Sequence, residues 1–168
     1  MKKLGYICLL ALLPTSQLFS QQISIDNTIP VQQLIENNLV DGCFEITNIS
    51  SPVNGSVNGF SSFAYFDQAS SNFPFENGIM LSTGNANSGG NTLNTDTLNE
   101  GQTNWGTDTD LETTLGISNT LNATSIEFDF VSISNTIQFN YILASEEYFS
   151  NFPCDYSDGL IKNANPSE

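Results

Sequence analysis

The stretch "SIEFDFVSISNTIQFNYIL", residues 125–143, consists of two runs in which apolar and polar side chains alternate. Alternation with a period of two predicts β-strands that are buried on one face. The residues expected to point inward are Ile126, Phe128, Phe130, Ile137, Phe139, Tyr141 and Leu143. We predict that residues 125–131 and 136–143 are strands, and the short connection "SISN" would allow them to pair as a hairpin.

Upstream of this stretch, the same reasoning predicts further strands. Residues 43–49 ("CFEITNI") and 60–66 alternate, and residues 78–82 ("GIMLS") form a short apolar run that is typical of a buried strand. One helix is expected at residues 29–39, with Asn27 or Thr28 as its cap. One short helix followed by alternating strands predicts a mainly β domain, built as an antiparallel β-sandwich or jelly roll.

The polar stretch of residues 83–122 contains a patch of alternating acids, Asp108, Asp110 and Glu112. Two interpretations are open. The alternation resembles the spacing of oxygen ligands in a calcium-binding loop, although the glycine and the distal glutamate of an EF-hand are missing. Alternatively, a helix begins in "DTDLETTLG", and its acids favour the positive end of the helix dipole.

The N-terminus has the pattern of an export signal. Lys2 and Lys3 precede an apolar run, residues 4–13, and cleavage is expected between Ser20 and Gln21. We therefore divide the chain into a signal peptide at residues 1–20, a polar lead-in at residues 21–27 and a β domain at residues 28–168. No later segment is apolar enough to span a bilayer, so we expect the mature protein to be secreted or held at the outer cell surface.

The composition narrows the classes of function. The chain has three lysine and arginine residues, eighteen acids and no histidine, for a formal charge of -15. The lack of histidine excludes Ser-His-Asp and Cys-His catalysis, as well as histidine-ligated metals. The lack of a basic patch argues against nucleic acid as a partner. Calcium is the common partner that such an acidic chain favours.

The acids are densest in "LASEEYFSNFPCDYSDG", residues 143–159. Three interpretations are open: a calcium site, solvent-facing acids at the end of a strand, and a carboxylate pair of the kind that hydrolyses glycosides. A divalent cation would relieve the repulsion between such close carboxylates, so calcium is our working hypothesis. The candidate ligands are Glu146, Glu147, Asp155 and Asp158, with Asp108 and Asp110 as a possible second contribution.

Cleavage of the signal removes Cys8 and leaves Cys43 and Cys154 as a pair in an oxidising compartment. A disulfide between them would close a loop of roughly 110 residues and stabilise the fold by about 4–5 kcal/mol on the chain-entropy model. The alternative is two separate buried thiols.

Four segments together resemble the choice-of-anchor L domain, in order and in spacing, over about residues 28–159. These are "ENGIMLSTGNA", "DTDLE", "SIEFDFV" and "IQFNYILASEEYFSNFPCDYSDG". The resemblance implies a module of large exported bacterial proteins that use a type IX secretion route, often with a gliding-motility-type sorting domain. Family members continue the Asp-Gly with a further strand, whereas "SDG" here runs into "LIKNANPSE", so we expect the domain to be incomplete at its C-terminus.

On these grounds the expected function is that of a noncatalytic extracellular module for adhesion or for binding a glycan or a surface protein, with calcium as a stabiliser. The alternative is a carboxylate-based glycoside hydrolase or an accessory domain of one.

Overall fold

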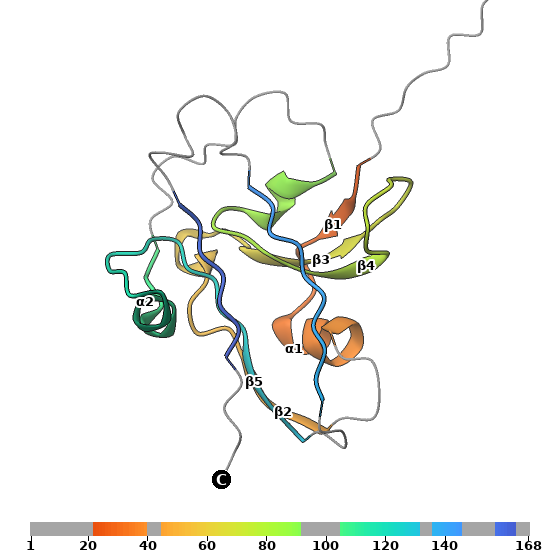
Figure 1. The fold of residues 1–168 in the computed structure, drawn as a ribbon. Helices are drawn as coiled ribbons and strands as arrows, with labels where there is room; N and C mark the ends of the chain where they lie inside the picture. Colours follow the sequence, from red (N-terminus) through yellow and green to blue (C-terminus); the bar gives the residue numbers. More distant parts are fainter. Residues whose placement is uncertain (1–21, 40–44, 92–104, 132–135, 146–156, 164–168) are drawn as a thin grey trace, which may run out of the picture.

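The computed structural model describes residues 22–39, 45–91, 105–131, 136–145 and 157–163. Within these ranges the chain forms two small antiparallel sheets and two short α-helices (Figure 1). The prediction of a mainly β domain with antiparallel sheets is therefore confirmed. The second α-helix was one of the two interpretations of the acidic patch at residues 108–112.

The first sheet has three strands in the order β1 (Ser24–Asp26), β3 (Phe63–Asp67) and β4 (Asn77–Leu81). All neighbours are antiparallel, with Ile25 opposite Phe66 and Ala64 opposite Met80. Because side chains alternate along a strand, Ala64 and Phe66 point to one face and build the core there. The cluster consists of Ile25, Ala64, Phe66 and Ala86, with Ile23, Phe73, Phe75 and Met80 packed against it.

The predicted helix near residues 29–39 is confirmed in two parts. It begins as α1 (Val31–Leu34) and continues as a π-helical segment, η1 (Ile35–Leu39). Leu34 and Ile35 are fully buried. The α1 helix contacts β2 and β3, and η1 contacts β4, so the helix lies between the two sheets (Figure 1).

The predicted cap of this helix is wrong. Pro30 occupies the N-cap position in an extended conformation and makes no side-chain cap hydrogen bond. Because the helix begins at Val31, after Pro30, neither Asn27 nor Thr28 is at the N-cap position. Instead, the amide and the hydroxyl of Thr28 donate to Oδ1 of Asp26, at 2.9 and 2.6 Å.

The second sheet pairs β2 (Glu45–Ser50) with β5 (Glu127–Val131). The predicted hairpin between residues 125–131 and 136–143 is thus wrong, because residues 136–143 form no strand and the partner of β5 is β2, from a distant part of the sequence. Alternation fixes which face of a strand is apolar, but it does not identify the neighbouring strand. The faces of β5 follow the prediction, since Phe128 and Phe130 are half-buried between exposed acids.

Residues 136–145 do not form a strand, and their predicted burial is also wrong. Figure 1 shows this segment (light blue) running past α1 without joining a sheet. The exposed large apolar residues in it are Ile137, Phe139, Tyr141, Ile142 and Leu143.

The remaining elements are short. Two 3₁₀ turns, η2 (Gly55–Asn58) and η3 (Ala86–Gly89), flank the first sheet, and α2 (Thr109–Leu115) stands apart from it (Figure 1). The lobe that carries α2 is closed at its base by Trp105 and Asn122, which exchange hydrogen bonds of 3.0 and 3.1 Å. The buried indole Nε1 donates to the carbonyl of Ala123 at 2.7 Å, and the ring stacks on Phe60.

Candidate functional site

The alternating acids of the lobe are explained by α2. Asp108 is the N-cap of this helix, and its Oδ1 accepts hydrogen bonds from the backbone amides of Asp110 and Leu111 at 2.9 and 3.0 Å. Asp110 and Glu112 lie in the first turn, where acids favour the helix dipole. Gly116 ends the helix with a φ of 66°, in the left-handed region. The helix interpretation of this patch is thus the one the structure supports.

The carboxylate of Glu112 connects the segment before α2 with the segment after it, through Thr107 and Thr120. One carboxylate oxygen accepts from the hydroxyl of Thr107 at 2.8 Å and from the backbone amide of Thr120 at 2.8 Å. The Thr120 hydroxyl adds a bond of 3.1 Å, and the two threonine hydroxyls also contact each other. The amide of Thr120, followed by the hydroxyl of Thr107, lowers the pKa of Glu112 from its ordinary value, because these donors stabilise the charged form. This acid has a structural role.

The proposed calcium ligands are only partly within the described ranges. Glu146, Glu147 and Asp155 lie outside them, as do Cys43, Cys154, Ser20 and Gln21. Asp158 is exposed, and its neighbour Gly159 packs against Leu115 at the last turn of α2, at the opposite end from Asp108. In the parts of the chain that are described, no three His, Cys, Asp or Glu residues are placed to hold a metal ion.

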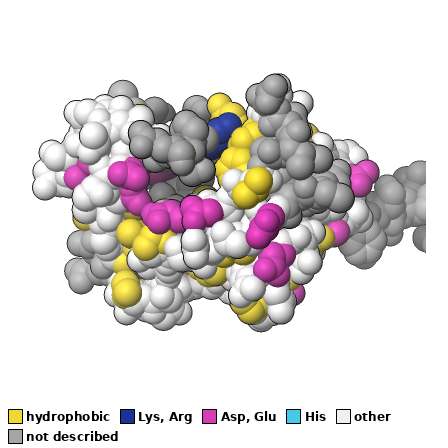
Figure 2. All heavy atoms as spheres, turned by 90° about the horizontal axis from the view of Figure 1, so that it is seen from below, with side chains coloured by type: hydrophobic (Ala, Val, Ile, Leu, Met, Phe, Trp, Pro, Cys, Tyr) yellow, Lys and Arg dark blue, Asp and Glu magenta, His cyan; other side chains and the backbone are white. Residues whose placement is uncertain are grey.

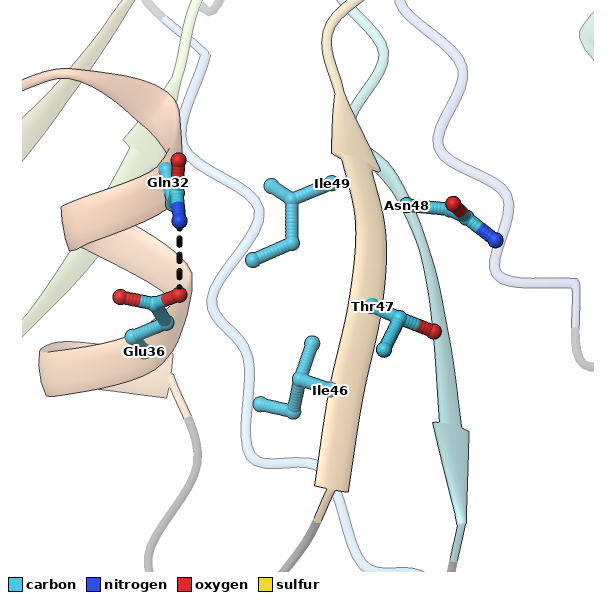
Figure 3. Close-up of a pocket in the computed structure, with 6 residues that line it drawn as sticks. All are labelled: Gln32, Glu36, Ile46, Thr47, Asn48 and Ile49. Atoms are coloured by element: carbon cyan, nitrogen blue, oxygen red, sulfur yellow. Dashed lines mark hydrogen bonds between the residues drawn. The ribbon is translucent and has the colours of Figure 1, made fainter.

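A hollow of about 170 Å³ lies between the helix and β2. Its walls are Gln32, Glu36, Ile46, Thr47, Asn48 and Ile49. Figure 3 shows Ile46 and Ile49 pointing toward the helix, where Gln32 donates to Glu36 at 3.0 Å. Ile46 and Ile49 are three positions apart, so in a regular strand they would face opposite sides. They face the same side here because the pairing shifts between Thr47 and Ser50, as at a β-bulge.

This hollow is too small for a sizeable ligand, since pockets for small molecules start at about 300 Å³. Asn48, which has a φ of 54°, directs its side chain to the other side of β2 and donates to Asp129 at 2.6 Å. The hollow therefore has room for a single small group only.

The larger candidate surface is the exposed segment of residues 136–145, which we call the aromatic segment. Tyr141 is 71% exposed and Phe139 is 36% exposed. Runs of large exposed apolar residues are uncommon on the surface of a monomeric protein, which makes this segment a candidate interaction surface. Figure 2 shows apolar side chains gathered beside a band of carboxylates on one face of the molecule.

Lys162 connects the aromatic segment to residues 157–163. Its Nζ lies 3.9 Å from the centroid of the Phe139 ring, within the range of a cation–π interaction. Among the described residues it is the only lysine or arginine. This cation is thus placed on an aromatic ring, and the described part of the chain has no second base to pair with its acids.

Comparison with known families gives one result. The model of the choice-of-anchor L domain matches residues 22–166. The chain belongs to the choice-of-anchor L domain family. Membership in this family points to a surface-anchored, noncatalytic module of an extracellular or cell-surface protein.

No curated protein and no solved structure matches the chain. Within the described part of this choice-of-anchor L domain, no helix has the length and apolar character that crossing a bilayer requires.

Sequence reasoning missed two features of this site. It placed Phe139 and Tyr141 in the core, because alternation alone cannot distinguish a buried strand from an extended segment that stays on the surface. It also gave no role to Lys162. The rarity of lysine in this chain was the one signal available, and it does not indicate which ring the ammonium group meets.

Proposed function

We propose that this choice-of-anchor L domain is a noncatalytic binding module at the cell surface, and that the aromatic segment is its contact surface. The single observation that carries the proposal is the exposure of Phe139 and Tyr141 together with Ile137, Ile142 and Leu143. Removing this apolar area from water would favour association with a partner. Tyrosine suits such a surface because its ring is apolar and its hydroxyl bonds to water or ligand.

The ligand class that fits best is a neutral glycan. Phe139 and Tyr141 are two positions apart, so we expect successive sugar units to stack their C–H faces on the two rings, with the sugar at Phe139 on the ring face that Lys162 does not cover. The charge of -15 repels anionic polysaccharides and nucleic acids. The amide side chains of Gln138 and Asn140 flank Phe139 in the sequence and are hydrogen-bonded to each other at 3.3 Å, and their remaining donors and acceptors would serve hydroxyl groups of the ligand.

The experiment is a binding measurement on the exported chain, with a neutral β-glucan or mannan and with anionic alginate. We expect binding to the neutral polymers and none to alginate. The variant Phe139→Ser with Tyr141→Ser should weaken binding at least tenfold, while Leu121→Ser, which removes an apolar side chain that is 61% exposed on the α2 lobe, should not. Equal binding by both variants would contradict the role of the aromatic segment.

Two supporting features belong to the same proposal. Export by cleavage before Gln21, followed by a type IX route, would bring the module to the surface, and N-terminal sequencing of secreted protein tests the cleavage.

Calcium held by Glu146, Glu147, Asp155 and Asp158 would stabilise the domain outside the cell, and the density of acids in residues 146–158 supports this proposal. A hydrolase is not proposed, because no observation on the described residues favours it over binding.

A further inference from the structure

Among the described residues, β1 is the outer strand of the first sheet, with β3 as its neighbour on one side. Alternate backbone groups of an edge strand point away from the sheet, and if they remain unpaired they template the addition of another chain. In β1, the N–H and C=O of Ile25 are the groups that point outward, because they bond to a residue outside the sheet.

That residue is Asn91, which pairs with β1 as a neighbouring strand would. Its side-chain Oδ1 accepts from the amide of Ile25 at 2.8 Å, and its Nδ2 donates to the carbonyl of Ile25 at 3.0 Å. Its backbone amide donates to the carbonyl of Ile23 at 2.9 Å. One residue thus satisfies three outward backbone groups. Beyond the end of β1, the carbonyl of Asn27 accepts from the hydroxyl of Ser61, which precedes β3, at 3.3 Å.

The position of Asn91 is held by its surroundings. Its φ is 63°, in a region that asparagine tolerates better than most residues. Its Nδ2 also donates to Oδ1 of Asn87 in η3 at 2.7 Å. The preceding Gly90 is buried under β1, where a Cβ atom would come within 2.5 Å of Ile25 Cγ1. This close approach is possible only for glycine, and it brings the Asn91 carboxamide to the strand edge.

We infer that Asn91 is an edge clasp, which closes β1 to the addition of a strand from a second copy of this chain. The clasp leaves the domain monomeric at this edge. A partner therefore has to engage the molecule elsewhere.

Two substitutions separate the clasp from simple loss of stability. Asn91→Gly tolerates the positive φ and removes the carboxamide, whereas Asn91→Asp keeps the acceptor for the Ile25 amide and loses the donor to its carbonyl. Hydrogen exchange at the Ile25 amide should accelerate at least tenfold in Asn91→Gly and less in Asn91→Asp. Exchange at Phe130 in the second sheet is the control and should not change. Asn91→Asp carries the same test if Asn91→Gly does not fold.

The second readout is the oligomeric state from sedimentation. Asn91→Gly should associate as concentration rises, and adding Ser24→Lys, a charge on the exposed edge, should restore the monomer. Unchanged exchange at Ile25 would overturn the inference. A strictly monomeric Asn91→Gly variant with rapid exchange would also overturn it, because the edge would then be open without recruiting a strand.

Discussion

The ammonium group of Lys162 lies 3.9 Å from the centroid of the Phe139 ring. This contact joins the aromatic segment to residues 157–163, which also pack on α2 through Gly159 and Leu115. The proposed contact surface is thus connected to the α2 lobe, although neither segment belongs to a sheet.

The first prediction concerns this pair. Lys162→Met keeps a long apolar stem and removes the charge. Because both residues are exposed, the coupling between Lys162 and Phe139 should be about 0.5–1 kcal/mol. A double-mutant cycle with Phe139→Leu, read from the free energy of unfolding in urea, measures it. Strictly additive effects of the two substitutions would show that the contact does not stabilise the segment.

A second prediction concerns the base of the α2 lobe. Trp105→Phe keeps a ring near Phe60 and removes the indole N–H, which leaves the carbonyl of Ala123 without its 2.7 Å donor. Leaving a buried acceptor unsatisfied costs about 1–3 kcal/mol. Phe60→Leu is the control: it removes the stacked pair and keeps the hydrogen bond, so about 0.5–1.5 kcal/mol should be lost from stacking. If Trp105→Phe proves the milder of the two in chemical denaturation, the hydrogen bond does not hold the lobe closed.

The third prediction concerns pH. The folded-state pKa of Glu112 lies below its ordinary value of 4.5, because the amide of Thr120 and the hydroxyl of Thr107 donate to the carboxylate. A carboxylate whose pKa is lowered by folding stabilises the fold at pH values above its unfolded-state pKa. This stabilisation is lost as the pH falls through the folded-state pKa. Glu112→Gln should therefore unfold with a weaker dependence on pH below about 4.5 than the wild type does.

The measurement is the thermal midpoint of both proteins from pH 6 down to the acid limit of folding. Asp110→Asn, on the same helix, is the control for the loss of one carboxylate. Parallel curves for wild type and Glu112→Gln would mean that the threonine donors do not favour the charged form.

The positions of the helices and strands in this domain could be predicted from the sequence more accurately than the pairing between the strands. The period of two in residues 125–131 gave the correct faces of β5, because exposure follows directly from alternation. The pairing of β5 with β2 depends on contacts between residues about eighty positions apart, such as Ile46 and Phe130, and no local pattern carries that information. The π-helical segment η1 and the bulge near Asn48 also have no sequence signature.

The candidate site was predicted less well. The helix at residues 109–115 could be predicted, since an aspartate cap, acids in the first turn and a terminal glycine each have a local physical cause. The exposure of Tyr141 could not, because the same alternating pattern that suits a buried strand also suits a segment that presents its rings to solvent. The edge contacts of Asn91 with Ile25 join residues 66 positions apart and were equally hidden.

A fourth prediction tests the calcium proposal. An extracellular site of this type binds calcium at about 10⁻⁴–10⁻³ M, and tenfold more calcium above the Kd should add about 1.4 kcal/mol to stability. The measurement is thermal unfolding in millimolar calcium against chelator. Glu147→Gln with Asp155→Asn should abolish the shift, while Asp110→Asn, whose acid serves α2, should retain it. If the wild-type midpoint is the same in calcium and in chelator, these acids form a solvated face without a metal.

The most direct test of the binding account is hydrogen exchange of the wild-type domain with and without a saturating neutral glycan. The prediction is slower exchange in residues 136–145 and in the adjoining residues 157–163, with no change around the hollow at Gln32, Glu36 and residues 46–49. Protection confined to the hollow, or the absence of any protection in residues 136–145 when the glycan is bound, would contradict the assignment of the aromatic segment as the contact surface.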